Sequence, residues 1–289
     1  MTRVLVLGSS GRIGTLLRAV WAQQTAGTGQ GAVSFVFQTR VAHGDDLLWD
    51  VAQPPPPAVV QAGPFDCMLV LSGIVPRPGA DFTRNTAIGS AALRAAAALG
   101  IGRVLLASTS AVYGTYSDAP FPEDAPLRPV NDYGRSKREM EAVCGQQAQA
   151  LGLGLCCLRI GNVAGADALL MNGAALGPQE KLRLDCFSDG GTPLRSYIGP
   201  HSLARVLLTL ACARGDLPTA LNIAAPHPVS MHALAQAARM PLELQPANDG
   251  SHQYITLDCS ALAQLHRFDP ACSEPGEMVR QWRAAASRA

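Results

Sequence analysis

The first 21 residues contain the feature that most limits how this chain can fold. A continuous apolar run at 4–7 is followed by three glycines in Gly8-Ser9-Ser10-Gly11-Arg12-Ile13-Gly14. Apolar residues at helical spacing come next, from Leu16 to Trp21. An unbroken apolar run predicts a strand that is buried on both faces, as in a parallel sheet. The order strand, glycine turn, helix therefore predicts the first unit of an α/β fold.

The same turn has the residue types that a pyrophosphate-binding loop requires. Its glycines let the backbone turn tightly and approach a ligand, and the N-terminus of the following helix stabilises an anion. An ordinary glycine-rich turn is the alternative interpretation. We expect a dinucleotide to bind here, with contacts from six residues of the turn: Gly8, Ser10, Gly11, Arg12, Ile13 and Gly14.

The end of a second predicted strand, at 33–37, is expected to face the ribose of that dinucleotide. An Asp or Glu there would accept hydrogen bonds from the ribose hydroxyls and select NAD, whereas a basic residue would pair with a 2′-phosphate and select NADP. The chain reads Gln38-Thr39-Arg40, with no acidic residue before Asp45. Arg40, together with Arg12, therefore favours NADP, although a solvated surface arginine is the alternative.

Strands and helices continue to alternate over the first half of the chain. The next segments are three strand-like runs and an Ala-rich helical stretch: 65–71, 104–107, 155–160 and 81–99. Such alternation predicts right-handed βαβ units and a parallel sheet, whose functional groups gather at the carboxyl ends of the strands. Ser72 and Gly73 follow one predicted strand end, and the segment 108–114 follows another.

Length and composition limit the rest of the architecture. The chain has 289 residues, of which 48% are hydrophobic and 16% charged, with a net charge of +1. Near-neutral charge gives no case for nucleic acid or an anionic membrane surface as a partner. The alternation breaks down after Ala164. We therefore predict a Rossmann-type doubly wound parallel sheet, with a dinucleotide-binding domain at 1–163 and a small substrate lobe at 164–289 that returns segments to the core sheet.

The eight cysteines are scattered and form no C-x-x-C pair. Free thiols in a reducing compartment are therefore expected, and no metal site is predicted. The apolar run at 4–7 is too short for the core of a signal peptide, and no apolar run approaches the length of a membrane span. These observations favour a cytoplasmic protein.

Tyr133 and Lys137 are the candidate proton-transfer pair. In a helix, a spacing of four residues places the phenol and the ammonium on one face. A nearby cation favours the phenolate, so Lys137 is expected to lower the pKa of Tyr133 and make it a proton donor and acceptor near neutral pH. Pairs at this spacing also occur by chance, so the argument depends on the motifs around this one.

These motifs together resemble those of the extended short-chain dehydrogenase/reductases. The resemblance is carried by the glycine turn, by Ser108-Thr109-Ser110-Ala111-Val112-Tyr113-Gly114 and by Tyr133-x-x-x-Lys137. More closely, the chain resembles the NAD-dependent epimerase/dehydratase branch, over nearly its whole length. Three further segments fit that branch: Asn85-x-x-x-Gly89, Arg159-x-x-Asn162-Val163-x-Gly165 and 191–198.

The resemblance implies hydride transfer at a secondary alcohol or ketone of a sugar or nucleotide-sugar. Tyr133 would be the acid/base, Lys137 would also hold the nicotinamide ribose, and Thr109 would orient the reacting oxygen. Ser110 is the alternative if the register is off by one, and Thr109 could instead satisfy the loop backbone. Further contacts are implied to the cofactor by Ser72, Gly73 and Asn85, and to the substrate by Ser110, Asn162 and Arg195.

Departures from the family pattern limit which of the family's reactions are expected. The 4,6-dehydratases have an acidic pair after the catalytic Thr, where this chain has Ser110-Ala111, so dehydration is not expected. Arg195 lies where the family's arginine grips a substrate pyrophosphate, but it could equally anchor the lobe by pairing with a carboxylate.

Epimerase and reductase both remain open. An epimerase keeps NAD through both half-reactions, whereas a reductase exchanges NADPH in each cycle. A non-catalytic NAD(P) sensor is the alternative from another functional class. The family often dimerises through two helices that include the Tyr-Lys helix, and Met140 and Val143 fit either a homodimer or core packing.

Overall fold

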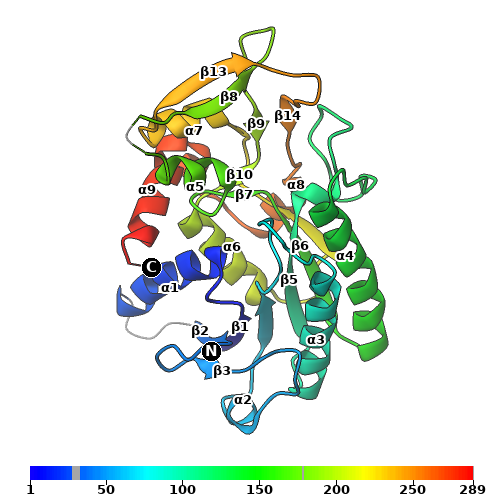
Figure 1. The fold of residues 1–289 in the computed structure, drawn as a ribbon. Coiled ribbons are helices and arrows are strands. Elements are labelled where there is room, and N and C mark those ends of the chain that lie inside the picture. The colour runs from blue at the N-terminus through cyan, green and yellow to red at the C-terminus, as the bar shows by residue number, and fades with distance from the viewer. Residues whose placement is uncertain (28–32, 178, 289) are drawn as a thin grey trace.

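The computed structural model describes residues 1–27, 33–177 and 179–288. Its centre is a parallel sheet with the strand order β11-β6-β5-β4-β1-β2-β3 (Figure 1). The strands are β1 (Thr2–Leu7), β2 (Val33–Thr39), β3 (Leu47–Leu48), β4 (Cys67–Val70), β5 (Arg103–Thr109), β6 (Gly154–Ile160) and β11 (Ala220–Ile223). The order reverses at β1, so β1 and β4 flank the crevice in which ligands of such sheets bind. The predicted Rossmann-type α/β fold is confirmed.

Helices cover both faces of this sheet. Helices α1 (Arg12–Gly27) and α6 (Pro200–Ala211) pack on one face, and α3 (Arg84–Ala98) and α4 (Asp132–Leu151) on the other. Residues of β1 alternate between the two cores, with Val4 and Val6 in the first and Leu5 and Leu7 in the second. A strand with both faces buried in this way explains the unbroken apolar run at its position.

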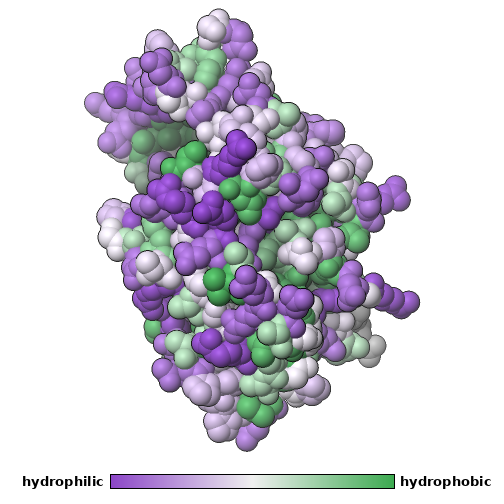
Figure 2. Space-filling view, turned by 90° about the vertical axis from the view of Figure 1, so that its right-hand side faces the viewer, coloured by the Kyte–Doolittle hydropathy of each residue, from purple (hydrophilic) through white to green (hydrophobic). Residues whose placement is uncertain are grey.

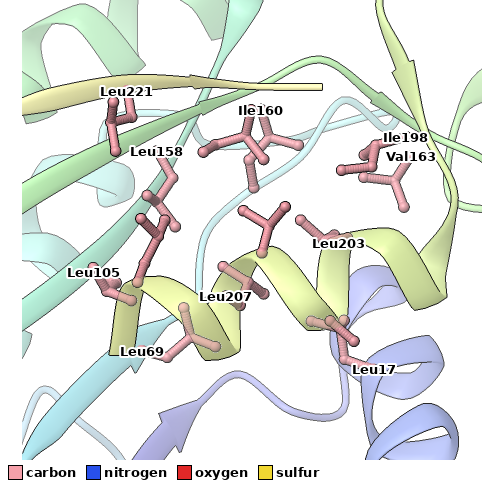
Figure 3. Packing of buried hydrophobic residues seen from close by; sticks show 14 of the residues in the cluster. Leu17, Leu69, Leu105, Leu158, Ile160, Val163, Ile198, Leu203, Leu207 and Leu221 are labelled. Carbon is pink, nitrogen blue, oxygen red and sulfur yellow. The ribbon is translucent and has the colours of Figure 1, made fainter. Parts of the chain in front are cut away.

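The core beneath α6 joins segments that are far apart in the sequence. Leu203 and Leu207 of α6 point toward Leu158 and Ile160 of β6, with Leu17 of α1 beside them (Figure 3). These contacts fix α1 against the sheet. The N-terminus of α1, at the glycine turn, is thereby held at the carboxyl edge of the strands.

Two short elements were not predicted. Strand β3 has only two residues and therefore shows no periodicity, and α2 (Pro57–Gln61) begins at the last proline of the run 54–57. Proline at the first helical position is compatible with a helix, because the missing N–H has no intrahelical partner there.

The C-terminal part combines short strand pairs with helices around a third apolar cluster. Its strand pairs are β7 (Asn162–Val163) with β10 (Tyr197–Ile198), β8 (Leu182–Cys186) with β13 (Leu242–Pro246), and β9 (Leu194–Arg195) with both β12 (Val229–Ser230) and β14 (Tyr254–Ile255). Its helices are α5 (Ala168–Ala174), α7 (Met231–Ala237), α8 (Ser260–Leu265), the 3-10 helix η2 (Pro270–Ser273) and α9 (Pro275–Ala286). The division of the chain at 163/164 stays a prediction.

Polar and apolar residues are interspersed on the face that contains α3 and α4 (Figure 2). Met140 is 1% exposed and packs in the core, whereas Val143 is 38% exposed. Of these two residues, Val143 is the one that a partner could contact, and a homodimer through these helices stays a prediction. No helix in the described ranges has the length and apolar character to cross a membrane.

Candidate functional site

The glycine turn between β1 and α1 is closed in a way that excludes side chains. Gly8 has a φ of +81°, and its carbonyl accepts a hydrogen bond from the amide of Gly11 (3.1 Å). A Cβ on Gly14 would lie 2.6 Å from the carbonyl oxygens of Gly8 and Ser9. Since α1 begins at Arg12, the turn leads directly into a helix N-terminus, where backbone N–H groups are available to an anion.

A cleft of about 340 Å³ lies beside this turn, at the ends of β1, β2 and β4. Six of the predicted cofactor contacts line it: Gly8, Ser10, Gly11, Arg40, Ser72 and Gly73. The other predicted contacts are outside its lining: Arg12, Ile13, Gly14, Asn85, Tyr133 and Lys137. The remaining lining residues were not predicted as contacts, among them Gln38, Asp50, Val51 and Arg84. The volume and the glycine backbone fit an extended dinucleotide.

Gln38 fixes the cleft wall at the end of β2. It is buried, its Oε1 accepts from the amide of Gly8 (3.2 Å), and its Nε2 donates to the carbonyl of Trp49. Gln38 thus ties the glycine turn to the segment after β3, which brings Asp50 and Val51 to the cleft. The only sequence signal for Asp50 was a carboxylate directly after the apolar run 47–49.

Asn85 is a bracing residue in this structure. Its Oδ1 accepts from the amide of Ile74 (2.8 Å), and its Nδ2 donates to Ser136 Oγ (3.0 Å) and to the carbonyl of Ile74 (3.2 Å). These bonds attach the segment after β4 to α4. A Cβ on Gly73, in that segment, would lie 3.1 Å from Lys137 Nζ, so the candidate catalytic lysine lies close behind a residue that lines the cofactor cleft.

The structure brings Thr109 and Tyr133 together. Thr109 ends β5, and Tyr133 lies in the first turn of α4, where Asn131 caps the helix by accepting from the amide of Gly134 (2.8 Å). A Cβ on Gly134 would lie 2.4 Å from the carbonyl oxygen of Ala111, so α4 packs directly against the 3-10 helix η1 (Ser110–Val112). The side chains of Thr109 and Tyr133 share a hydrogen bond.

The pKa of Tyr133 differs from the prediction made from the sequence. Burial raises the pKa of Tyr133, while the hydrogen bond with Thr109 opposes that shift. Burial also lowers the pKa of Lys137 to about 8, and its Nζ donates to the carbonyl of Ala107 (2.9 Å). The prediction of a lowered Tyr133 pKa is therefore wrong for this structure, because desolvation of the phenol outweighs the opposing hydrogen bond from Thr109, and Lys137 is not among the groups that shift it.

A second cavity, of about 250 Å³, has Thr109 in its wall. The three predicted substrate contacts, Ser110, Asn162 and Arg195, line it together with Thr109. The Arg195 guanidinium donates to three backbone carbonyls, those of Leu194 (2.7 Å), Gln253 (2.9 Å) and His252 (2.9 Å). Carbonyls, and not the carboxylate that was the alternative, thus anchor Arg195 at the cavity wall.

A buried polar network supports the site from below. Arg159 pairs with Glu141 (2.9 Å) and donates to the hydroxyl of Tyr113 (2.9 Å), which itself donates to Asn222 (2.8 Å). Burial raises the pKa of Tyr113 to about 12, so this phenol stays protonated. Sequence reasoning missed Glu141, for which the i,i+4 spacing from Lys137 was the available signal.

The described ranges of the chain contain no group of three or more His, Cys, Asp or Glu side chains placed to hold a metal ion.

Comparisons with known proteins identify the family of the chain. The sequence model of the NAD dependent epimerase/dehydratase family matches residues 74–224. A UDP-glucose 4-epimerase from Azospirillum brasilense is 35% identical over 178 residues, which are 55% of this chain and 51% of the relative. The chain thus spans about half the length of the curated relatives that it matches.

Solved structures share the fold at lower identity. A UDP-glucose 4-epimerase from Brucella ovis in complex with NAD superposes with a TM-score of 0.77 at 22% identity, covering 97% of both chains. TunA, an NAD dependent NDP-hexosamine 5,6-dehydratase, gives a TM-score of 0.76 at 20% identity over 100% of this chain and 99% of that one. Together with the family match and the motifs, these findings place the chain in the NAD dependent epimerase/dehydratase family.

Proposed function

We propose that this protein is an NAD(P)-dependent epimerase or reductase that acts on a secondary alcohol or ketone of a sugar or nucleotide-sugar. The hydrogen bond between Thr109 and Tyr133 carries the proposal, because it joins the candidate proton donor to a residue that lines the cavity of the predicted substrate contacts. The name of the Azospirillum brasilense relative supports a nucleotide-sugar substrate.

The chain's own residues fit a nicotinamide dinucleotide. The closed glycine turn leaves room for a pyrophosphate at the N-terminus of α1, and Gly73 leaves room beside Lys137. Lys137, with a pKa of about 8, is mostly charged at neutral pH and would donate to the ribose hydroxyls. A bound nicotinamide supplies the hydride acceptor and donor of the reaction.

Tyr133 would then move the proton of the reacting hydroxyl. Because its pKa is raised, Tyr133 is protonated and has a proton to donate to a substrate alkoxide, and Thr109 would hold the same oxygen by a hydrogen bond. Ser110-Ala111 offers no acidic group after Thr109, so we propose epimerisation or reduction in preference to dehydration. The likeness to TunA concerns the fold and leaves this argument from the residues unchanged.

For the cofactor we propose NAD(P), with NADP favoured by Arg40, which is exposed at the cleft edge. The nucleotide released on denaturing freshly purified protein tests this choice. Stoichiometric NAD would support an epimerase and refute the preference for NADP. An empty protein that binds NADPH more tightly than NADH would support a reductase.

The catalytic role is tested with Tyr133→Phe. Turnover is followed by NMR of the anomeric protons of UDP-glucose and UDP-galactose, and by NADPH oxidation with UDP-4-ketohexoses. We expect turnover to fall by about 10²–10⁴-fold, with nicotinamide binding unchanged. Tyr116→Phe, at an exposed tyrosine, is the control. Wild-type turnover in Tyr133→Phe would show that another group transfers the proton.

A further inference from the structure

The segment between β4 and α3 places an aromatic side chain against the candidate catalytic tyrosine. Phe82 packs its ring against that of Tyr133, with 5.7 Å between the ring centroids and 53° between the ring planes. Within 75–83, Ala80 and Phe82 are half-buried and the other residues are exposed. Phe82 is therefore the large side chain of this segment that covers the phenol.

Hydrogen bonds connect the backbone of Phe82 to the turn of α4 that contains Tyr133. The carbonyl of Phe82 accepts from the amide of Asn85 (3.0 Å), and Asn85 Nδ2 donates to Ser136 Oγ (3.0 Å). Ser136 Oγ in turn donates to the carbonyl of Tyr133 (2.8 Å). Asn85 and Ser136 are both buried, so water does not compete for these bonds. Together with the ring contact, the bonds form a closed circuit of four residues.

The turn that presents Phe82 is also held from its outer side. Thr83 donates to Asp81 Oδ1 from its amide (3.2 Å) and from its hydroxyl (2.5 Å). At the start of the segment, Ile74 is bonded to Asn85 through both its amide and its carbonyl. A side chain whose backbone is fixed at both ends can hold a neighbouring group in one orientation.

The phenol of Tyr133 contacts Thr109 through its hydroxyl and Phe82 through its ring. Burial raises the pKa of Tyr133, and the hydrogen bond with Thr109 opposes that shift. Charged residues near the two rings in the sequence do not contribute to it: Asp81, Arg84, Asp132 and Arg135. The protonation of Tyr133 thus depends on how completely water is excluded, and Phe82 is one of the groups that exclude it.

We propose that Phe82 is a positioning residue for proton transfer by Tyr133: its ring holds the phenol within reach of Thr109 and keeps water away from it. The inference rests on the proposed function only in taking Tyr133 as the acid/base. Tilted aromatic pairs at this separation favour one mutual orientation, so the contact restricts rotation of the phenol. Loss of the ring would free that rotation and admit water.

Nitration by tetranitromethane at mildly alkaline pH, measured at each tyrosine by peptide mass spectrometry, tests the shielding without any substrate. We expect Tyr133 in the wild type to react at least about tenfold more slowly than Tyr116, which is 42% exposed. Phe82→Ala should raise the rate at Tyr133 by about tenfold, the change that one pKa unit makes to the phenolate fraction. Phe82→Leu keeps an apolar cover and should stay within about twofold of the wild type. Phe187→Ala, at another half-buried phenylalanine, is the matched control.

Two results would overturn the proposal: equal rates at Tyr133 in the wild type and Phe82→Ala, or a wild-type Tyr133 that reacts as fast as Tyr116. Neither result affects the Tyr133→Phe test of the proposed function. Tyr113 and Tyr197 are 0% and 1% exposed, so they report in the same samples whether the variant is folded. If both also react faster in Phe82→Ala, Ser136→Ala takes its place, because it breaks the same circuit at the carbonyl of Tyr133. Faster nitration of Tyr133 alone is then expected, and an unchanged rate would overturn the proposal.

Discussion

Gly134 allows the first turn of α4 to lie against the backbone of η1. Replacing it with alanine adds one methyl group to a buried position. The new Cβ would lie 2.4 Å from the carbonyl oxygen of Ala111 and 2.9 Å from Cβ of Pro129. Real Cβ atoms do not approach other atoms closer than 3.0 Å, so α4 and η1 must separate by at least about 0.6 Å. Since Tyr133 and Thr109 lie on the two sides of this contact, their hydrogen bond would be stretched.

Two opposing effects determine how much Gly134→Ala changes the free energy of unfolding. Alanine is the better helix former by about 1 kcal/mol, whereas forcing a group into a packed site costs about 1–3 kcal/mol. The obstacle is backbone that cannot rotate away, so the upper part of that range applies. We expect a net loss of about 1–2 kcal/mol. A misplacement of this size near reacting groups also lowers turnover, by about 10- to 100-fold.

Gly145→Ala provides the matched control, because Gly145 lies in the same helix and an added Cβ meets nothing within 4 Å. We expect it to raise the free energy of unfolding by about 1 kcal/mol and to leave turnover unchanged. Urea titration of both variants at 25 °C measures the difference. Equal stabilisation by Gly134→Ala and Gly145→Ala would refute the claim that the contact with Ala111 constrains the site.

Three further predictions concern residues around the same helix. Glu141→Gln leaves the buried Arg159 charge unpaired, so it should cost about 3–5 kcal/mol in urea titration, and Glu141→Gln with Arg159→Met should cost less than the sum of the single changes. The pKa of Lys137, about 8, lies below its unfolded value of 10.5. As the pH rises, the folded state therefore loses this proton before the unfolded state does. The stability of the wild type relative to Lys137→Met should therefore rise with pH between 8 and 10.5, by up to about 1.4 kcal/mol per pH unit, and a flat difference would contradict the shift. Thr109→Val should lower turnover by about 10- to 100-fold, while Thr109→Ser retains most of it.

Local patterns in the sequence were enough to predict the sheet and the three candidate catalytic residues. The glycine turn, the strand end at Thr109 and the Tyr133–Lys137 spacing each depend on residues within one turn or one strand. Asp50 could not be foreseen as part of the cleft, because Gln38 places its segment there through contacts with both Gly8 and Trp49. The same holds for the β8–β13 pair, which joins segments about 60 residues apart.

The direction of the Tyr133 pKa shift depends on burial. The i,i+4 spacing of a tyrosine and a lysine in the sequence gives no information about burial. Desolvation penalises the charged form of each group and therefore raises the pKa of Tyr133 and lowers that of Lys137. The two pKa values thus move in opposite directions from 10.0 and 10.5, which favours a neutral phenol and an ammonium that releases its proton easily. The structure therefore presents a protonated phenol, hydrogen-bonded to Thr109, as the candidate proton donor of the site.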